Sequence, residues 1–198
     1  MPEMELKAAL IAQAAIGGSH RILDLGAGTE TLTLELKQTA PAAEVIGLDG
    51  DARVIKIARR KAAAAGLPIR FDRGSATALP YDSYSFDRVF ASLMLHHLSL
   101  EDKRAALGEV RRVLRSGGEL HILDFGEPRS LPAHLVSLVM SHIEETRELI
   151  AGRLPAMLQE AGFDHVEETA RRLTLIGALN LYRGRKSRLP WSPALPAS

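Results

Sequence analysis

The chain has 198 residues, a length that fits one domain with a sizeable core. Hydrophobic residues make up 46% and charged residues 25% of it, which excludes a disordered protein, and its net charge of +1 gives no reason to expect a nucleic-acid partner. It contains no cysteine, which excludes disulfides, thiolate nucleophiles and cysteine-bound zinc.

The N-terminal segment has acidic residues early and no basic stretch, so it does not resemble a secretion signal. We interpret residues 4–16 as a helix ended by Gly17 and Gly18. No apolar run approaches the length needed to span a bilayer. We therefore expect a soluble, cytoplasmic protein without membrane insertion, either a monomer or a homodimer.

Strands and helices alternate through the first 125 residues. The expected strands are residues 21–25, 44–48, 67–71, 86–92 and 119–125, and the expected helices are residues 29–39, 51–65 and 100–114. Ser116, Gly117 and Gly118 are expected to form the turn before the fifth strand. This alternation predicts a parallel sheet with right-handed crossovers.

The remaining chain is predicted to close that sheet. Helices are expected at residues 131–150 and 154–161, followed by two strands at residues 163–168 and 173–182. No helix separates these strands, so they predict an antiparallel hairpin that turns near Arg171 and Arg172. The fold class is thus a single doubly wound, Rossmann-like α/β domain with seven strands, mostly parallel with an antiparallel C-terminal hairpin strand. We assign it residues 1–186 and expect residues 187–198 to form a flexible tail.

A glycine turn, Gly26-Ala27-Gly28, joins the first predicted strand to the next helix. Glycines there let a ligand lie against bare main chain, and the helix N-terminus offers unpaired N–H groups. The turn lacks a third glycine, so an ordinary glycine turn is the alternative. Asp49 ends the next strand, where a carboxylate can accept hydrogen bonds from ribose hydroxyls. The alternative for Asp49 is a helix cap, a role for which Asp51 is better placed. Together the turn and the acid predict nucleoside binding without choosing between a dinucleotide and S-adenosylmethionine.

Three linked stretches resemble class I S-adenosylmethionine-dependent methyltransferases, in particular the group that includes the ubiquinone/menaquinone methyltransferases. The first stretch is ILDLGAGTETLTLEL with VIGLDGDARVIKIARRKA, the second is FDRGSATALPYDSYSFDRVFASLMLHHL and the third is LGEVRRVLRSGGELHILDFGEP. They follow the family's order over roughly residues 20–127. The resemblance implies S-adenosylmethionine as cofactor, a small-molecule methyl acceptor and no nucleic acid.

The resemblance also implies roles for individual residues. Gly26, Ala27, Gly28 and Thr29 belong to the turn under the methionine part of the cofactor, and Asp24 orients its amino group through water. Asp49 holds the ribose hydroxyls, with Gly50 and Asp51 beside the adenosine. The adenine is bordered by Ser75, Ala76 and Thr77, and the methionine end is approached by Ala91 and Ser92.

Two positions depart from the family pattern. Glu30 stands where glycine is usual, and an inward carboxylate there would repel the carboxylate of the cofactor. Ser75 stands where aspartate is frequent, and a neutral hydroxyl makes a weaker hydrogen bond to the adenine. An outward Glu30 is harmless, so we expect the cofactor still to bind, with reduced affinity as the alternative.

His96 and His97 follow the fourth strand, at the expected open edge of the sheet. Imidazole titrates near neutrality, so one of them is a candidate general base. A structural pair that caps the next segment is the alternative, and we interpret Asp124 as a strand-end residue. No pattern of metal ligands occurs in the sequence.

The predicted reaction is methyl transfer by in-line displacement to a small molecule, for which an apolar compound is one option. One alternative is a cofactor-binding regulatory protein that keeps the fold without turnover. The other is an NAD-dependent oxidoreductase, which the missing third glycine disfavours.

Overall fold

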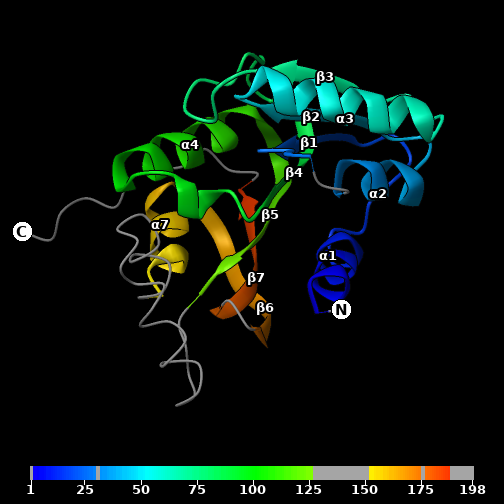
Figure 1. Cartoon of the computed structure of the whole chain (residues 1–198). Coiled ribbons are helices and arrows are strands. Elements are labelled where there is room, and N and C mark those ends of the chain that lie inside the picture. Colours follow the sequence, from blue (N-terminus) through cyan, green and yellow to red (C-terminus); the bar gives the residue numbers. More distant parts are fainter. Residues whose placement is uncertain (1, 30–31, 127–151, 175–176, 188–198) are drawn as a thin grey trace, which may run out of the picture.

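The chain forms one seven-stranded sheet flanked by helices (Figure 1). The computed structural model describes residues 2–29, 32–126, 152–174 and 177–187. The strands are β1 (Arg21–Leu25), β2 (Glu44–Asp49), β3 (Arg70–Arg73), β4 (Phe86–Ser92), β5 (Leu114–Phe125), β6 (Phe163–Thr174) and β7 (Gly177–Lys186). The helices are α1 (Pro2–Ala12), α2 (Leu32–Thr39), α3 (Ala52–Ala64), the short 3-10 helix η1 (Leu95–His97), α4 (Leu100–Val113) and α7 (Leu154–Glu160).

The strand order is β3-β2-β1-β4-β5-β7-β6. β1 pairs in parallel with β2 and β4, whereas β7 is antiparallel to both of its neighbours, β5 and β6. The predicted fold class is therefore confirmed. The order reverses between β1 and β4, and ligands of such sheets bind beyond the carboxyl ends of the strands at this switch point.

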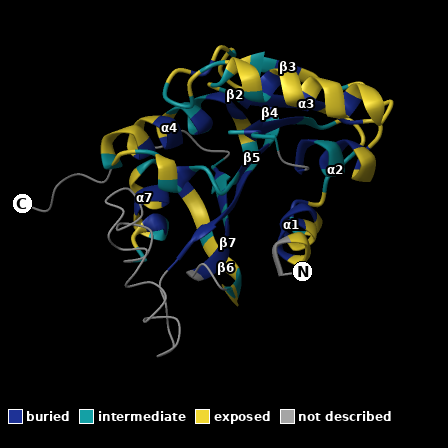
Figure 2. Ribbon diagram, in the orientation of Figure 1, coloured by how far each residue is buried: buried dark blue, intermediate teal, exposed yellow. Residues whose placement is uncertain are grey.

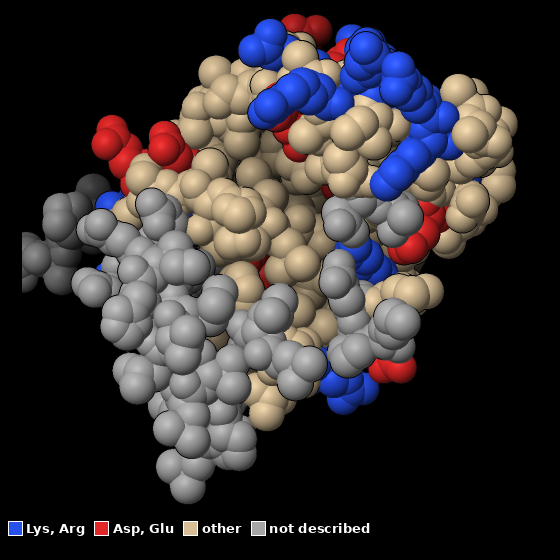
Figure 3. All heavy atoms as spheres, viewed as in Figure 1, with Lys and Arg blue, Asp and Glu red and all other residues tan. Residues whose placement is uncertain are grey.

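Burial explains why these segments form these elements. The central strands are apolar and buried on both faces, as the dark ribbons in Figure 2 show, because helices cover the sheet on each side. α3 shows the helical counterpart of this pattern. Its apolar side chains Ile55, Ala58 and Ala62 are buried, and its exposed face is rich in Lys and Arg (Figure 3).

Several predicted boundaries were wrong. α1 ends at Ala12 rather than at residue 16, and Ala15 already has a left-handed backbone with φ of 44°. The third strand runs over residues 70–73 rather than 67–71, because the N–H of Leu67 still bonds to Ala62 at the end of α3. The predicted helix at residues 131–150 lies outside the described residues.

The expected turn before the fifth strand is an irregularity inside β5. The pairing of β4 with β5 jumps from Phe86–Leu114 to Arg88–Glu119, so residues 115–118 are accommodated as an insertion. The closing hairpin also turns later than expected. Arg171 and Arg172 are paired within the hairpin, and its pairing continues to Thr174 and Gly177. The additional pairs place the turn beyond both arginines.

No helix of the described residues is long and apolar enough to cross a membrane.

Candidate functional site

The glycine turn and Asp49 meet at the carboxyl ends of β1 and β2. The N–H of Gly28 donates to Asp49 Oδ2 at 3.0 Å, and the N–H of Asp51 donates to Asp49 Oδ1 at 2.9 Å. The N–H of Ala27 donates to the carbonyl of Leu48 at 2.9 Å, which ties the turn to β2. The carboxylate is thus held in one orientation by main-chain donors.

Gly26 is the position where this turn requires glycine. Its φ of 68° lies in the left-handed region, and a Cβ there would come within 2.8 Å of the Met94 Cβ. The main chain of Gly26 is therefore the wall of the site, and Met94 on the loop after β4 packs closely over it.

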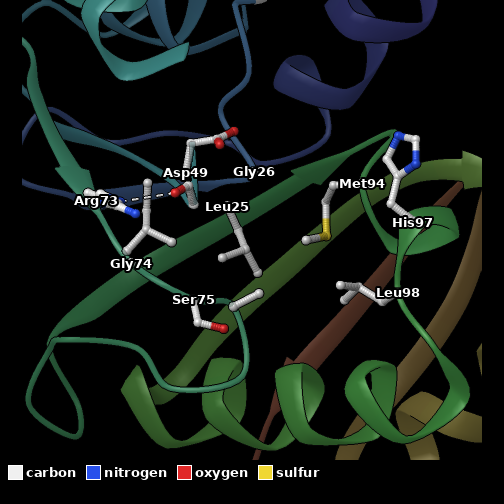
Figure 4. Close-up of a pocket in the computed structure, with 12 residues that line it drawn as sticks. Leu25, Gly26, Asp49, Arg73, Gly74, Ser75, Met94, His97 and Leu98 are labelled. Carbon is white, nitrogen blue, oxygen red and sulfur yellow. Dashed lines mark hydrogen bonds between the residues drawn. The ribbon is translucent and has the colours of Figure 1, made fainter. Parts of the chain in front are cut away.

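A cavity of about 590 Å³ opens at this place (Figure 4). In Figure 4 it runs from Arg73, Gly74 and Ser75 at one end to Met94 and His97 at the other. Arg73 Nε donates to the carbonyl of Gly50 at 3.2 Å, which fixes the first end. The full lining is Leu25, Gly26, Leu48, Asp49, Gly50, Arg73, Gly74, Ser75, Ala76, Met94, His97 and Leu98.

A second cavity of about 400 Å³ adjoins the first, because Gly26, Asp49, Met94 and His97 line both. Its other walls come from α1, from the carboxyl ends of β4 and β5, and from η1. These further lining residues are Lys7, Gly28, Ser92, Leu93, His96 and Phe125. The two cavities therefore form one bent space with Asp49 and Met94 at the junction.

Asp24 lies under the glycine turn and is 1% exposed. Thr33 Oγ1 donates to its Oδ2 at 2.5 Å. Burial raises the pKa of this carboxyl to about 7, although the Thr33 hydrogen bond and the nearby charge of Lys7 both act to lower it. Asp24 titrates near neutral pH in the folded chain.

His96 faces the second cavity with an acid behind it. Its Nδ1 lies 2.9 Å from Oδ1 of Asp124, a fully buried carboxylate at the end of β5. The ring also contacts Phe125 edge-on, and it lies 3.9 Å from the ring of His97 between centroids. His96 stands on η1, and its ring is therefore oriented by Asp124 of β5 as well.

Nine of the predicted site residues line the two cavities: Gly26, Gly28, Asp49, Gly50, Ser75, Ala76, Ser92, His96 and His97. Six others lie behind or beside the walls: Asp24, Ala27, Thr29, Asp51, Thr77 and Ala91. Asp51 caps α3 and pairs with Arg53 at 2.8 Å, and its hydrogen bonds to Arg53 lower the pKa of its carboxyl to about 2. Thr77 instead shares a hydrogen bond of 2.8 Å with the Ser75 hydroxyl. Glu30 lies outside the described residues.

Sequence reasoning missed part of the lining. Arg73 ends β3 and Gly74 follows it, and Phe125 ends β5, so all three stand at the edge of the sheet where ligands bind. Their position at the carboxyl ends of strands was the signal from which these three lining residues could have been predicted. Lys7 comes from α1, and no local pattern in the sequence points to it.

Comparisons with known proteins agree on one family. A family model described as a methyltransferase domain matches residues 22–118. A demethylmenaquinone methyltransferase of Deinococcus radiodurans is 34% identical over 181 residues, covering 88% of this chain and 74% of that protein. The chain belongs to the class I S-adenosylmethionine-dependent methyltransferases.

Two further comparisons describe how far this methyltransferase resembles known proteins. A demethylmenaquinone methyltransferase of Thermus thermophilus is 46% identical over 108 residues, which span 54% of this chain and only 48% of the relative. The crystal structure of a putative methyltransferase from Bacillus halodurans has a TM-score of 0.71 at 20% identity and covers 91% of this chain and 98% of that one. The family predicted from the sequence is confirmed, and membership argues against an NAD-dependent oxidoreductase.

The methyltransferase site fits the cofactor that the family implies. A side chain at Gly26 would meet Met94, so bare main chain forms the wall beside Asp49. Each oxygen of the Asp49 carboxylate accepts one main-chain hydrogen bond and keeps a further lone pair for a hydroxyl. The cavity of about 590 Å³ is within the usual size of small-molecule sites.

Proposed function

We propose that the chain transfers the methyl group of S-adenosylmethionine to a ring carbon of a small apolar quinol. One observation carries the proposal. The Asp49 carboxylate and the bare main chain at Gly26 stand at the junction of two cavities, so a nucleoside in the first has its far end at the opening of the second.

The proposed cofactor contacts follow from this geometry. Asp49 accepts from the two ribose hydroxyls, and Gly50 lies beside the adenosine. Ser75 and Ala76 border the adenine at the Arg73 end of the first cavity. Gly26 and Gly28 lie under the methionine part, and Ser92 approaches it from the end of β4.

The remaining proposed residues act from behind the walls. Asp24 reaches the amino group of the cofactor through water, because it lies under the turn and lines neither cavity. Ala27, Thr29 and Ala91 shape the main chain, and Asp51 and Thr77 fix the loops on which Asp49 and Ser75 stand.

The second cavity supports an apolar acceptor. Leu93, Met94 and Phe125 supply aliphatic and aromatic surface there, and both relatives described above are named for a demethylated quinone. The reduced form of such a ring has electron-rich carbons beside its hydroxyl groups. A quinol therefore offers both an apolar body for this cavity and a carbon nucleophile.

When bound, S-adenosylmethionine supplies a methyl group on a positively charged sulfur whose departure needs no acid. The residues of this chain have to align the acceptor with that methyl and exclude water. Met94 lies at the junction of the cavities, and its apolar side chain keeps water from the reacting atoms there.

The experiment that tests the proposal has two stages. Calorimetric titration of the full chain with S-adenosylmethionine, S-adenosylhomocysteine and NADH is expected to give binding of the first two and none of NADH. Anaerobic incubation with S-adenosylmethionine and dithionite-reduced demethylmenaquinone is then expected to give a carbon-methylated product by mass spectrometry. Tight cofactor binding without product from quinols would favour a non-catalytic binding protein, and methylation of amines alone would overturn the acceptor assignment.

A further inference from the structure

A fully buried carboxylate, Asp124, holds one of the two histidines at the site. Its Oδ2 accepts from the N–H of Leu95 at 2.9 Å, and its Oδ1 accepts from the N–H of Phe125 at 2.8 Å. The Nδ1 of His96 lies 2.9 Å from the same Oδ1. Asp124 is 0% exposed, so these donors replace the water that the carboxylate loses on burial.

This arrangement sets the proton position on His96. Each oxygen of Asp124 accepts a main-chain hydrogen bond, as the oxygens of an ionised carboxylate do, and an ionised carboxylate has no proton to give. The Nδ1 of His96 must therefore carry the proton that it shares with Asp124. In the neutral ring this leaves a lone pair on Nε2.

The Nε2 of His96 makes no hydrogen bond to any of the residues that the structure describes. The side chain of His96 lines the second cavity, where the acceptor is proposed to bind. Its ring cannot rotate freely, because Phe125 packs edge-on at 5.0 Å and Asp124 holds Nδ1. The lone pair on Nε2 of His96 is therefore held in one orientation at the wall of the second cavity.

We propose that His96 is the general base of the reaction and that Asp124 is its positioning residue, so that the acceptor class is a hydroxylated ring such as a hydroquinone or phenol. This inference rests on the proposed function. Only an acceptor whose nucleophile must lose a proton needs such a base. The pair therefore favours hydroxyl-bearing acceptors over neutral amines, which attack with a free lone pair.

Protons and electrons balance in this step. Nε2 of His96 takes the hydroxyl proton of the acceptor, and the O–H electron pair becomes the second bond of a carbonyl. The ring pair that this releases forms the new carbon–carbon bond to the methyl group, and the donor sulfur keeps the electron pair of the broken bond. The ring carbon later loses its hydrogen as the carbonyl oxygen regains a proton, so one proton leaves to solvent overall.

Other charged groups also face this base. Asp124 stands on β5 behind it and His97 beside it on η1, while Lys7 on α1 and Asp49 on β2 line the same cavity. The positive charge of Lys7 favours the partial negative charge that develops on the acceptor oxygen as its proton leaves. The carboxylate of Asp124 stabilises the imidazolium that forms on His96.

The test compares three variants with wild type on dithionite-reduced demethylmenaquinone. H96Q keeps a hydrogen-bonding side chain and is expected to lower kcat about 10²- to 10⁴-fold, with affinity for S-adenosylmethionine within about threefold of wild type. D124N is expected to lower kcat less than H96Q and to leave the KM for the quinol within about threefold of wild type, because Asp124 contacts the base and does not line the acceptor cavity. H165Q, on the exposed surface of β6, is the control and keeps the wild-type rate.

A measurement on the wild-type chain covers the case in which D124N does not fold. Nitrogen-15 NMR of the histidine rings, assigned with H96Q, is expected to show a protonated Nδ1 and a bare Nε2 on His96 above neutral pH. A proton on Nε2 would overturn the inference whatever the kinetics.

The kinetic outcomes separate this inference from the proposed function. A wild-type chain that binds no S-adenosylmethionine refutes both. A wild-type chain that methylates the quinol, with H96Q within about threefold of its kcat, refutes only the role of His96. An H97Q variant that loses as much kcat as H96Q would also refute the inference, because His97 is not the residue that Asp124 holds.

Discussion

The two adjoining cavities differ in what their walls are made of. The first includes three glycines on the turns that follow β1, β2 and β3, and one carboxylate at the end of β2: Gly26, Gly50, Gly74 and Asp49. The second shares Gly26 and Asp49 with the first and adds side chains from α1, β4, η1 and β5, which are far apart along the chain. A wall of bare main chain requires glycine, so it produces a recognisable sequence pattern. A wall of side chains can be built from different residue types for different acceptors, so it produces no fixed pattern.

Asp24 lies beneath the junction of these two regions and is expected to show the largest effect. Its folded-state pKa of about 7 lies above its ordinary value of 3.8, so its contribution to stability is full below about pH 4 and is lost as pH rises to 7. Between pH 5 and 8 the loss is about 3 kcal/mol. Asp24→Asn does not titrate, so relative to wild type it should gain that amount over this range.

Urea unfolding of wild type and Asp24→Asn at pH 5 and pH 8 measures this difference. Thr33→Val is the matched variant: it removes the hydrogen bond that lowers the pKa of Asp24, so the loss of stability should continue to higher pH. Parallel pH dependence in wild type and Asp24→Asn would show that the carboxyl does not titrate in this range.

Asp49→Ala tests the proposed cofactor contacts at the junction of the two cavities. It removes the proposed ribose contacts and leaves the N–H groups of Gly28 and Asp51 without their acceptor. Hydrogen bonds to a charged group contribute about 1.5–3 kcal/mol each, so the loss of two should lower affinity for S-adenosylmethionine by at least about 100-fold by calorimetry. Asp51→Ala should cost far less affinity, because that carboxylate caps α3. Equal losses in the two variants would place the ribose elsewhere.

Gly26→Ala tests the wall that the two cavities share. The new Cβ would come within 2.8 Å of Met94 on a left-handed backbone, so we expect a loss of about 2 kcal/mol in unfolding free energy. Gly66→Ala is the matched control, since Gly66 has φ of 65° and open space around its Cβ position. It should lose only about 1 kcal/mol from backbone strain. If both variants lose the same amount, the contact with Met94 has no energetic weight.

His121→Gln is expected to have the smallest effect on stability among these variants. The residue lies on β5, the strand that contributes Phe125 to the second cavity. His121 is fully buried on β5, stacked on Phe90, and burial lowers its pKa. Its contribution is present above the unfolded pKa near 6.5 and is lost as pH falls through the folded value. The variant should therefore lose less stability than wild type in acid, as urea unfolding at pH 7 and pH 5 would show. A steeper acid loss in the variant would contradict this assignment.

Local patterns explain which parts of the fold were predictable. β1 and β4 begin and end where the sequence indicates, because Gly26 ends the first run and the apolar residues Val89, Phe90 and Ala91 mark the second. β5 begins earlier than predicted, since Ser116, Gly117 and Gly118 favour a turn while the β4 pairs on either side of them, at Leu114 and Glu119, keep the segment within the strand. The hairpin turn was misplaced for the same reason: pairing with β7 outweighs the polar character of Arg171 and Arg172.

Some contacts of the candidate site could also be predicted from the sequence, and others could not. The meeting of Gly28 with Asp49 was predictable because parallel strands bring consecutive turns to one edge. The contact of His96 with Asp124 joins residues 28 positions apart, and Asp124 alone resembles any strand-end acid. The signal was available only in strand order: Ser92 pairs with Leu123, so whatever follows β4 lies against the end of β5.

The insertion of β7 between β5 and β6 has a consequence for biosynthesis. While the ribosome has delivered only the first 126 residues, β5 is the border of an unfinished sheet, with its outward amides and carbonyls open to other chains. That border is sealed only when the stretch ending at Lys186 has emerged and docked. β5, the strand that bears Asp124, therefore gains its second neighbour late in synthesis. A nascent chain stalled before that point exposes an unpaired strand edge with which other chains can pair.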